Sequence, residues 1–317
     1  MWRSAEPMTL VLAWLRLLRL PNHATAVADV LAGFLIVSQS QALQWPAAPL
    51  WWAIAASVCF YGAGMVLNDV LDLELDRTQR PERPLPSGLI DAQTAATVGN
   101  RLFTIGSVCA CGAAFVSGQP AVALVGAAIT AAVWTYDRYA KHTPWGPIAM
   151  GSCRSLNWLL GMTAAGGPDI PHQWLLPAGM GLYVAGITLY SRNEAGQSRS
   201  TALLLATLTM LMGLLVAGSH TWLMAQGGDG SLWLRNGHLP SWCLLWGVLG
   251  ASILLRSVFG ILDPTSRRVQ AAVGNAIMSI ITLDAVLVLA ACGQQWAVVV
   301  LILLVPFFFG RQLVAAT

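Results

Sequence analysis

Charged residues are scarce in this chain of 317 residues. Lysine and arginine together number 17 and aspartate and glutamate 14, so that 10% of the chain is charged while 56% is hydrophobic. A soluble domain cannot bury so much apolar surface, and no segment between the apolar runs is long enough to form one. The composition therefore excludes a soluble globular protein. It predicts a polytopic membrane protein with a single domain over residues 1–317.

Other features are missing as well. None of the six cysteines stands at the spacing of a zinc site, so we interpret them as small packing residues. No basic patch is interleaved with aromatic residues, and we therefore expect no nucleic-acid partner. Residues 1–20 do not read as a cleavable signal peptide. They are basic and partly apolar, and we expect a short amphipathic helix that lies on the membrane before Pro21.

Long apolar runs dominate the rest of the chain. Each is long enough to cross a bilayer of about 30 Å, and short polar turns separate them. The runs predict an all-α, polytopic bundle of nine or ten transmembrane helices. They cover residues 22–41, 47–67, 93–116, 119–136, 145–165, 173–191, 201–225, 241–261, 269–292 and 295–313.

The basic residues between these runs predict the topology. If the N-terminus is cytoplasmic, the outer loops carry only Arg235, and the positive-inside rule is obeyed. Both termini and the loops near residues 68–88, 137–143 and 191–200 then face the cytoplasm. The inner segments carry Arg3, Arg16, Arg19, Arg77, Arg80, Arg83, Arg138, Lys141, Arg192, Arg199, Arg267, Arg268 and Arg311.

Acidic residues are concentrated directly after the second apolar run. Asp69, Asp72 and Asp76 are spaced i, i+3, i+7 and would share one helix face, while Glu74 falls on the other side. Like charges repel one another, and near lipid this repulsion is costly unless a cation neutralises it. Mg²⁺ suits the position because it prefers carboxylate oxygens and completes its shell with water and phosphate oxygens.

Three arginines follow the aspartates and would contact the same phosphates as such a metal ion. A solvated loop with incidental acids is the alternative interpretation. The arginines are Arg77, Arg80 and Arg83.

The whole stretch, NDVLDLELDRTQRPERPLPSG over residues 68–88, resembles the first Asp-rich motif of the UbiA superfamily of intramembrane prenyltransferases. That motif reads N-D-x-x-D-x-x-x-D and is followed by R-P-[IL]-x-S-G. The resemblance implies a nine-helix core, so that the run at 295–313 would be an added C-terminal helix. It also implies Mg²⁺ bound to a prenyl diphosphate, with metal ligands at Asn68, Asp69, Asp72, Asp76 and Glu194.

The last of these ligands comes from a second motif that departs from the family pattern. UbiA-like proteins carry D-x-x-x-D after the sixth helix, whereas residues 189–196 read LYSRNEAG and keep Glu194 as the one carboxylate. This is similar to the S-R-x-E variant of the EboC-like bacterial subgroup. One carboxylate is a weak Mg²⁺ site, but Arg192 offers a bidentate cation to phosphate oxygens. We predict that Arg192 replaces part of the second metal, with Glu194 orienting it or completing a single Mg²⁺ shell. A salt-bridged helix end is the alternative.

Further basic residues are candidates for the diphosphate. The segment YDRYAKHT at 136–143 resembles the family's Y-x-x-x-K-R segment, which makes Arg138 and Lys141 diphosphate ligands unless they only serve the positive-inside pattern. Arg154 lies inside the fifth predicted helix, with Asn157 at i+3. A charge at that depth needs a partner or a polar cavity. We expect the two to contact phosphate or acceptor, or Arg154 to pair with a buried acid.

Two acids inside helices complete the set. Asp29 lies on one stripe with Asn22, and the pair is our candidate for binding a polar acceptor, with Asp29 as a general base. Asp284 lies in the ninth predicted helix. Either acid has an alternative role as the ion-pair partner of Arg101, Arg154 or Arg256.

The sequence therefore predicts a Mg²⁺-dependent transferase that moves a prenyl group from a prenyl diphosphate to an unidentified acceptor inside a bacterial cytoplasmic membrane. The subgroup resemblance favours a polyol-like acceptor. A UbiA-like terpene cyclase and a non-catalytic binding protein or carrier stay open. A CDP-alcohol phosphotransferase is set aside because its D-G-x-x-A-R run is absent. The predicted catalytic residues are Asp69, Asp72, Asp76, Arg192 and Glu194.

Overall fold

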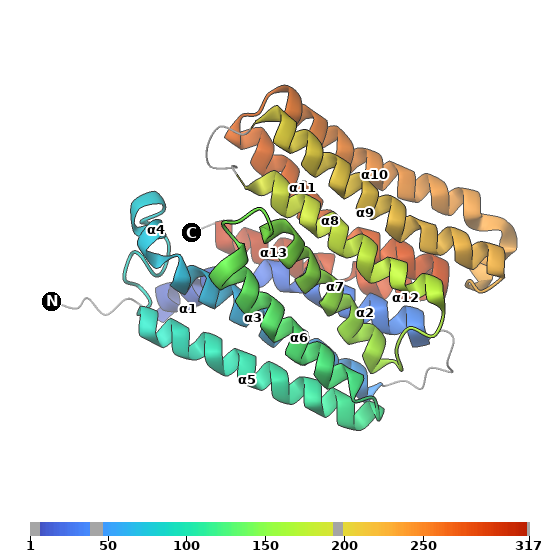
Figure 1. The fold of residues 1–317 in the computed structure, drawn as a ribbon, viewed down its shortest axis with the longest axis horizontal. Coiled ribbons are helices and arrows are strands. Elements are labelled where there is room, and N and C mark those ends of the chain that lie inside the picture. Colours follow the sequence, from blue (N-terminus) through green and yellow to red (C-terminus); the bar gives the residue numbers. More distant parts are fainter. Residues whose placement is uncertain (1–6, 39–46, 193–198, 316–317) are drawn as a thin grey trace.

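The computed structural model describes residues 7–38, 47–192 and 199–315, which form helices joined by short connections, with no strand among them (Figure 1). The predicted all-α bundle is confirmed. Helices at the N-terminal half are α1 (Pro7–Leu17), α2 (Leu20–Ser38), α3 (Ala48–Leu71), α4 (Leu73–Gln79), α5 (Ala92–Ser117), α6 (Ala121–Thr135), η1 (Tyr136–Ala140) and α7 (Gly146–Ala164). They are followed by η2 (Pro171–Trp174), α8 (Leu175–Ser191), α9 (Ser200–Gly227), η3 (Leu234–His238), α10 (Leu239–Leu262), α11 (Ser266–Cys292), α12 (Gln294–Leu301) and α13 (Leu304–Ala315).

Each of the ten apolar runs contains a helix within the described residues. Within the described residues, 8 helices are long and apolar enough to cross a membrane. The other two runs are α6, which has 15 residues and continues into the π-helical turn η1, and α7, whose interior carries Arg154 and Asn157. The last run is divided between α12 and α13, with a break at 302–303.

The ends of α5 show why the helices begin and end where they do. The Asp91 carboxylate accepts a hydrogen bond from the Thr94 backbone N–H at 2.8 Å, which satisfies one donor of the first turn. At the other end Gly118 adopts a left-handed conformation with φ 68°, which a residue without Cβ tolerates best. Pro120 follows and starts α6 almost immediately, so α5 and α6 are antiparallel neighbours.

The bundle is organised around α2, whose side chains from Pro21 to Ser38 are nearly all buried. It packs against α3, α7, α11 and the two C-terminal helices. Glycines bring other helices close: a Cβ at Gly213 on α9 would lie 2.6 Å from the carbonyl oxygen of Gly179 on α8. This is the small-residue packing that membrane helices use in place of a hydrophobic driving force.

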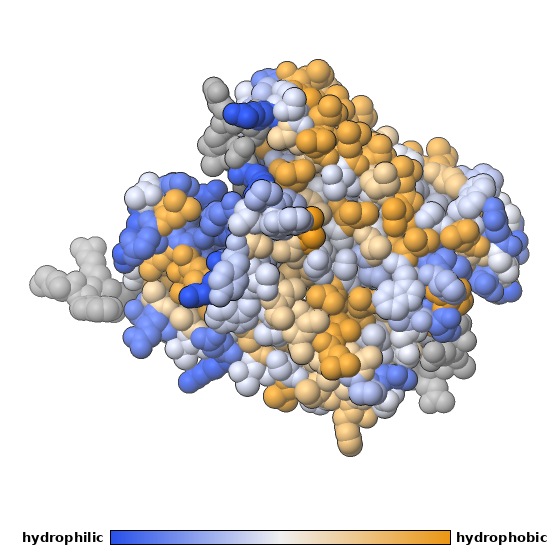
Figure 2. All heavy atoms as spheres, in the orientation of Figure 1, coloured by the Kyte–Doolittle hydropathy of each residue, from blue (hydrophilic) through white to orange (hydrophobic). Residues whose placement is uncertain are grey.

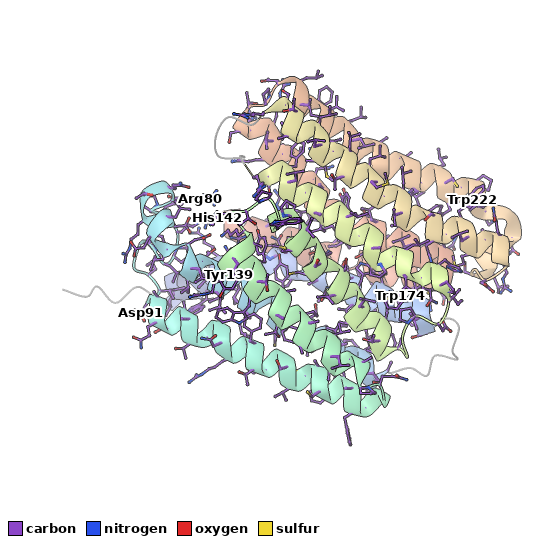
Figure 3. The ribbon with its side chains drawn as sticks, in the orientation of Figure 1. Arg80, Asp91, Tyr139, His142, Trp174 and Trp222 are labelled. Atoms are coloured by element: carbon purple, nitrogen blue, oxygen red, sulfur yellow. The ribbon has the colours of Figure 1, made fainter. Side chains whose placement is uncertain are left out.

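The connections gather at two opposite ends of the bundle. One end carries α1, α4, η1 and the α10–α11 connection, and we call it the basic end because the loops predicted to face the cytoplasm meet there (Figure 1). Figure 2 shows apolar residues over the middle of the bundle and hydrophilic residues towards both ends. Trp174 and Trp222 lie at the end opposite the basic one (Figure 3), where interfacial tryptophans are expected.

A small second core supports the basic end. Ala13 and Leu17 of α1 pack with Val66 of α3 and with Leu85 and Ile90 from the loop after α4. A backbone hydrogen bond from Ile90 N–H to the Pro84 carbonyl, at 3.2 Å, folds that loop back on itself. The α4 helix and its loop are thereby held over the end of α3, and this fixes the positions of the acidic residues.

Candidate active site

The Asp-rich stretch forms a corner between two helices. The α3 helix ends at Leu71, Asp72 adopts φ −86° and ψ 0°, and α4 begins at Leu73. This break interrupts the single stripe predicted from the i, i+3, i+7 spacing. Asp69 and Asp76 are buried, at 6% and 4% exposure, whereas Asp72 is partly open. Glu74 points away, as predicted, and pairs with Arg77 at 2.6 Å.

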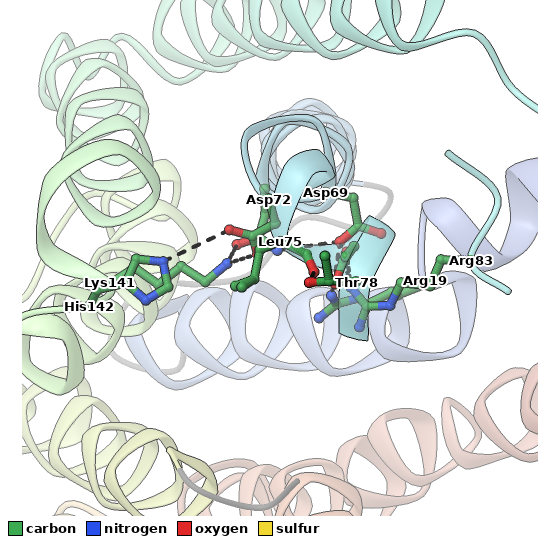
Figure 4. Close-up of polar contacts among 10 residues, drawn as sticks. Arg19, Asp69, Asp72, Leu75, Thr78, Arg83, Lys141 and His142 are labelled. Carbon is green, nitrogen blue, oxygen red and sulfur yellow. Dashed lines mark hydrogen bonds and ion pairs between the residues drawn. The ribbon is translucent and has the colours of Figure 1, made fainter. Parts of the chain in front are cut away.

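Two arginines neutralise the buried carboxylates. Arg83 places Nη1 2.7 Å from Asp76 Oδ2 and 3.6 Å from Asp69 Oδ1, so that it bridges α3 and α4. Arg19, in the turn between α1 and α2, places Nη2 3.2 Å from the same Asp69 oxygen (Figure 4). The sequence spacing did not predict these contacts. Those of Arg83 depend on the loop after α4 folding back, and that of Arg19 joins residues 50 positions apart.

The third aspartate is bound from another element. Lys141, just after η1, donates from Nζ to Asp72 Oδ2 and to Asn68 Oδ1, the latter at 2.7 Å (Figure 4). His142 lies farther away, with Nε2 4.0 Å from Asp72 Oδ1. The π-helical turn directs this segment back towards α3, and such turns are frequent at functional sites.

These groups surround a cavity of about 640 Å³ at the basic end, which we call the mouth cavity. Arg80 and His142 approach it from α4 and from the segment after η1 (Figure 3). Basic side chains outnumber acidic ones among its described lining residues, so the cavity favours anions. The basic residues are Arg19, Arg80, Arg83, Lys141 and Arg192, and the acids are Asp72, Asp76 and Asp137.

Asp137 is an acid that the motif comparison did not select. Burial in the cavity wall raises the pKa of Asp137 to about 7, although Lys141 nearby lowers it. The raised pKa favours the neutral form of this carboxyl group, which reduces its negative charge in the mouth cavity.

The donor atoms suit Mg²⁺ better than a softer metal. Asn68, Asp72 and Asp76 present amide and carboxylate oxygens to the mouth cavity, and Mg²⁺ needs only one or two carboxylates when phosphate and water complete its shell. Across the part of the chain that the structure describes, no three His, Cys, Asp or Glu side chains form a metal-binding group by themselves. Among the described members of the predicted ligand set, Asp69 faces Arg19 and Arg83 instead of the other oxygen ligands.

Other predicted residues lie elsewhere. Arg77 is paired with Glu74 on the exposed face of α4 and does not line the mouth cavity, and Arg138 lines a separate pocket beside Asn100 of α5. Arg192 does line the mouth cavity and donates to the Thr143 carbonyl. Its predicted partner Glu194 lies outside the described residues.

A second cavity, of about 280 Å³, continues from the first between the helices, and we call it the inner cavity. The two share six described lining residues: Arg19, Met65, Tyr136, Asp137, Met150 and Ser191. Its walls are mostly apolar and include Phe60, Ile129, Val133, Ile277 and Ile280.

Polar side chains from α2, α3 and α7 meet at the inner cavity. Arg154 Nε lies 2.7 Å from Asp29 Oδ2, and its Nη2 donates to the Thr25 carbonyl at 3.1 Å. Asn157 Nδ2 donates to the same Asp29 oxygen at 2.9 Å, while Ser57 Oγ donates to Asn157 Oδ1 at 2.6 Å. Arg154, Asn157 and Ser57 line the cavity, and Asp29 stands behind them fully buried.

Asp29 forms the ion pair with Arg154 that was considered as its alternative role. Asn22, its predicted companion at the acceptor site, lines the inner cavity. Asp284 on α11 is fully buried and close enough to Asp29 for the two carboxyl groups to interact. Arg154 is therefore held by a buried acid, which was the second of the two roles considered for it.

Arg19 is the main residue that the motifs missed. It lines both cavities and contacts Asp69, yet the positive-inside rule seemed to account for it. It has φ 49° and is the non-glycine residue with positive φ among those described, a conformation that tends to mark functional sites. A basic residue directly before the first apolar run, three positions from Asn22, is the one sequence signal for it.

The geometry agrees with comparisons to known proteins. The model of the UbiA prenyltransferase family matches residues 26–280, and the chain belongs to that family. The UbiA resemblance predicted from the Asp-rich stretch is confirmed. The finer assignment to the EboC-like subgroup stays a prediction, since the curated relatives found are archaeal enzymes.

These relatives are named digeranylgeranylglyceryl phosphate synthase. The one from Sulfolobus acidocaldarius is 35% identical over 99 residues, 31% of this chain and 34% of that protein. The one from Methanocaldococcus jannaschii is 36% identical over 95 residues, 30% of this chain and 32% of that protein. The matched segments thus span about a third of the length of the relatives.

Solved structures share the fold over nearly the whole chain. A digeranylgeranylglyceryl phosphate synthase and the apo form of a UbiA homologue from Aeropyrum pernix K1 each superpose with a TM-score of 0.61 at 19% identity; they cover 88% and 86% of this chain and 98% of each of those chains. A UbiA homologue from Archaeoglobus fulgidus bound to GPP and Mg²⁺ gives a TM-score of 0.57 at 11% identity, over 84% of this chain and 99% of that chain.

Proposed function

We propose that this protein is an intramembrane prenyltransferase that uses Mg²⁺ to transfer a prenyl group from a prenyl diphosphate to a second substrate. The observation that carries the proposal is the junction of two cavities. A cation-rich mouth with oxygen ligands opens into a mostly apolar inner cavity between helices. A prenyl diphosphate has the matching shape, since a compact anionic head is joined to an apolar chain.

The head of that substrate would lie among the basic residues of the mouth cavity. Arg83 and Lys141 already bind carboxylates and have donors that phosphate oxygens would satisfy equally well. Arg80 and Arg192 approach from α4 and α8 and supply further positive charge. Arg77 and Arg138 are left out of this proposal because neither lines the mouth cavity.

Asn68, Asp72 and Asp76 are the residues that would hold Mg²⁺ beside the diphosphate. When bound, the ion supplies charge stabilisation for the departing diphosphate. The UbiA homologue from Archaeoglobus fulgidus was solved with GPP and Mg²⁺, which supports the same pair of ligands here. For Asp72 to take this role it must exchange Lys141 for the metal, and Lys141 then becomes available to phosphate.

The chain's own residues would assist departure of the diphosphate and protect the allylic cation that is left. Arg83, Lys141 and Arg192 stabilise the negative charge as it develops on the leaving group. The walls around Phe60, Ile129 and Ile280 contain few groups that bind water, so the cation is shielded from hydrolysis. No covalent intermediate with the protein is required.

The acceptor would enter the inner cavity and meet its polar side. Arg154, Asn157 and Ser57 present donors and acceptors there, held in place by Asp29. We propose a hydroxyl-bearing acceptor on this basis. The archaeal relatives named digeranylgeranylglyceryl phosphate synthase support a lipid-type alcohol, and the S-R-x-E resemblance supports a polyol-like one. Asn22 lies on the path between mouth and inner cavity as a further contact.

The altered second motif fits a site with one metal ion. Arg192 lines the same mouth cavity as Asp72 and Asp76, and it would contact the diphosphate in place of the second Mg²⁺ of the family pattern. Glu194 is proposed to orient Arg192 or to complete the single metal shell. The S-R-x-E resemblance supports a bacterial cytoplasmic membrane, and the positive-inside pattern supports a basic end that faces the cytoplasm.

Product analysis tests the proposal. Purified protein in detergent receives prenyl diphosphates of several lengths with Mg²⁺ or EDTA, with and without a membrane-lipid extract, and the lipids are analysed by mass spectrometry. A new mass equal to an extract component plus a prenyl group, formed only with Mg²⁺, is the expected result. Diphosphate release with cyclised hydrocarbon and no extract requirement would instead establish a cyclase. Tight binding without release would establish a binding protein.

A further inference from the structure

A third pocket lies beside the mouth cavity at the basic end and shares Arg19 with it. It encloses about 320 Å³ between the α1–α2 turn, the start of α11 and the end of α13, and we call it the side pocket. Arg16, Arg19 and Arg311 line it, and no acidic residue of the described chain does. Its apolar wall is formed by Pro21, Ile277 and Phe307.

The pocket is built by close packing of α13 on α2. Phe307 is buried, at 2% exposure, and a Cβ at Gly310 would lie 3.1 Å from Pro21 Cγ. The next residue along α13, Arg311, therefore comes close to the α1–α2 turn. In that turn the Arg19 N–H donates to the Arg16 carbonyl at 3.0 Å, which keeps these two arginines together. Backbone packing thus brings three cations together at the side pocket.

Arg311 forms no ion pair with any described residue, whereas Arg19 is already bound to Asp69 at 3.2 Å. Arg311 also lies beyond residue 280, where the match to the family model ends. One wall of the side pocket, from α13, therefore lies outside the segment that matches the family model.

The opposite face of α13 indicates where a ligand would come from. Val305, Phe308 and Phe309 are exposed on that face, at the i, i+3 and i+4 positions of one helical stripe. Phe307, Gly310 and Arg311 lie on the inward stripe. A molecule with a phosphate among the arginines and hydrocarbon chains along the outer stripe would satisfy both faces of the helix.

We propose that the side pocket binds the phosphate headgroup of an anionic membrane lipid, whose chains run along the outer face of α13. Arginine suits the headgroup because its planar fork binds two phosphate oxygens at once. The wall at Pro21 and Phe307 excludes water from one side of the headgroup. This site does not depend on the proposed prenyl transfer, since its arginine on α13 takes no part in the mouth cavity.

Two substitutions test the site by different means. Arg311→Gln removes the unpaired cation, and Arg267→Gln is its control, an exposed arginine at the same end that lines none of the three cavities. Gly274→Leu fills the pocket and leaves every charge in place, because a Cβ at Gly274 meets nothing within 4 Å. Gly247→Leu, whose Cβ is equally free on α10, is the control for that change.

The measurement is native mass spectrometry of the full chain in a neutral detergent, titrated with dioctanoyl phosphatidic acid, dioctanoyl phosphatidylcholine or inorganic phosphate. We expect one phosphatidic acid to bind preferentially, and Arg311→Gln and Gly274→Leu each to weaken it about tenfold while the controls match the wild type. Equal affinity across all four variants would overturn the site. Inorganic phosphate binding as tightly as the lipid would overturn the lipid as its ligand.

Discussion

The Arg154 guanidinium on α7 and the Asp29 carboxylate on α2 lie 2.7 Å apart in the middle of the bundle, and Asp29 has no exposed surface. Removing the arginine alone leaves a buried acid without its cation, beside a second buried acid at Asp284. We predict that Arg154→Met lowers the free energy of unfolding by about 3–5 kcal/mol.

Thermal unfolding in detergent measures this effect. The double change Asp29→Asn with Arg154→Met should recover much of the loss, because neither charge is then stranded. Arg256→Met, at an exposed position on α10, is the matched control and should be close to neutral. A single Arg154→Met variant as stable as the control would contradict the role of this pair.

Arg83 and Arg77 follow the same motif but have different environments. Arg83 bridges Asp69 and Asp76 at the mouth cavity, whereas Arg77 pairs with exposed Glu74. Arg83→Ala should reduce kcat/KM for a prenyl diphosphate about 10–100-fold, since a charge-assisted contact to phosphate is lost. Arg77→Ala should leave it within about twofold, as exposed pairs contribute little. Steady-state kinetics at several substrate concentrations, with unfolding curves for both variants, check the prediction. Equal losses would place the diphosphate elsewhere.

On the proposed function, Lys141 would compete with Mg²⁺ for Asp72. Its Nζ binds the Asp72 carboxylate and lies 2.7 Å from Asn68 Oδ1. We expect Lys141→Met to lower the Mg²⁺ concentration needed for half-maximal activity, because a neighbouring cation has been removed. The same change should raise the KM for prenyl diphosphate, since a phosphate contact is lost. A titration of both ligands separates the two effects, and a rise in both constants would contradict the exchange of Lys141 for metal.

Asp137 gives a pH dependence whose sign can be stated. Burial raises the pKa of Asp137 to about 7 in the folded protein, whereas the pKa of an aspartate in an unfolded chain is about 4. The folded state therefore holds a proton that the unfolded state releases, and stability falls as pH rises through this window. The charged groups that face it are Lys141, Asp72, Arg19 and Asp69.

Asp137→Asn removes this contribution. In the absence of Mg²⁺ and substrate, the melting temperature of the variant minus that of the wild type should therefore increase between about pH 5 and pH 8. Glu82→Gln, at an exposed position in the loop after α4, should show no such gain. A constant difference across pH would mean that Asp137 titrates normally.

The sequence predicted the helices well because their physics is simple. A span needs about 20 apolar residues, and the runs show this length directly. The break between α12 and α13 was not visible, since residues 302–303 are as apolar as their neighbours.

The sequence predicted which residues belong to the site better than it predicted how they contact one another. Asn68, Asp72 and Asp76 line the mouth cavity as expected, but the corner at Asp72 turns Asp69 towards Arg19 and Arg83. Such contacts join segments far apart in the chain, and no local periodicity encodes them. Arg19 was overlooked because a general rule about membrane topology already explained its charge.

The central claim is metal-dependent departure of the diphosphate, and Asp72 is its most direct probe. Asp72→Asn keeps the shape of the side chain but weakens an oxygen ligand at the mouth cavity, while Glu74→Gln makes the same change on the exposed face of α4. The measurement is Mg²⁺-dependent diphosphate release from a prenyl diphosphate by both folded variants. The account predicts release lost in Asp72→Asn and preserved in Glu74→Gln. Release at the wild-type rate from Asp72→Asn would contradict it.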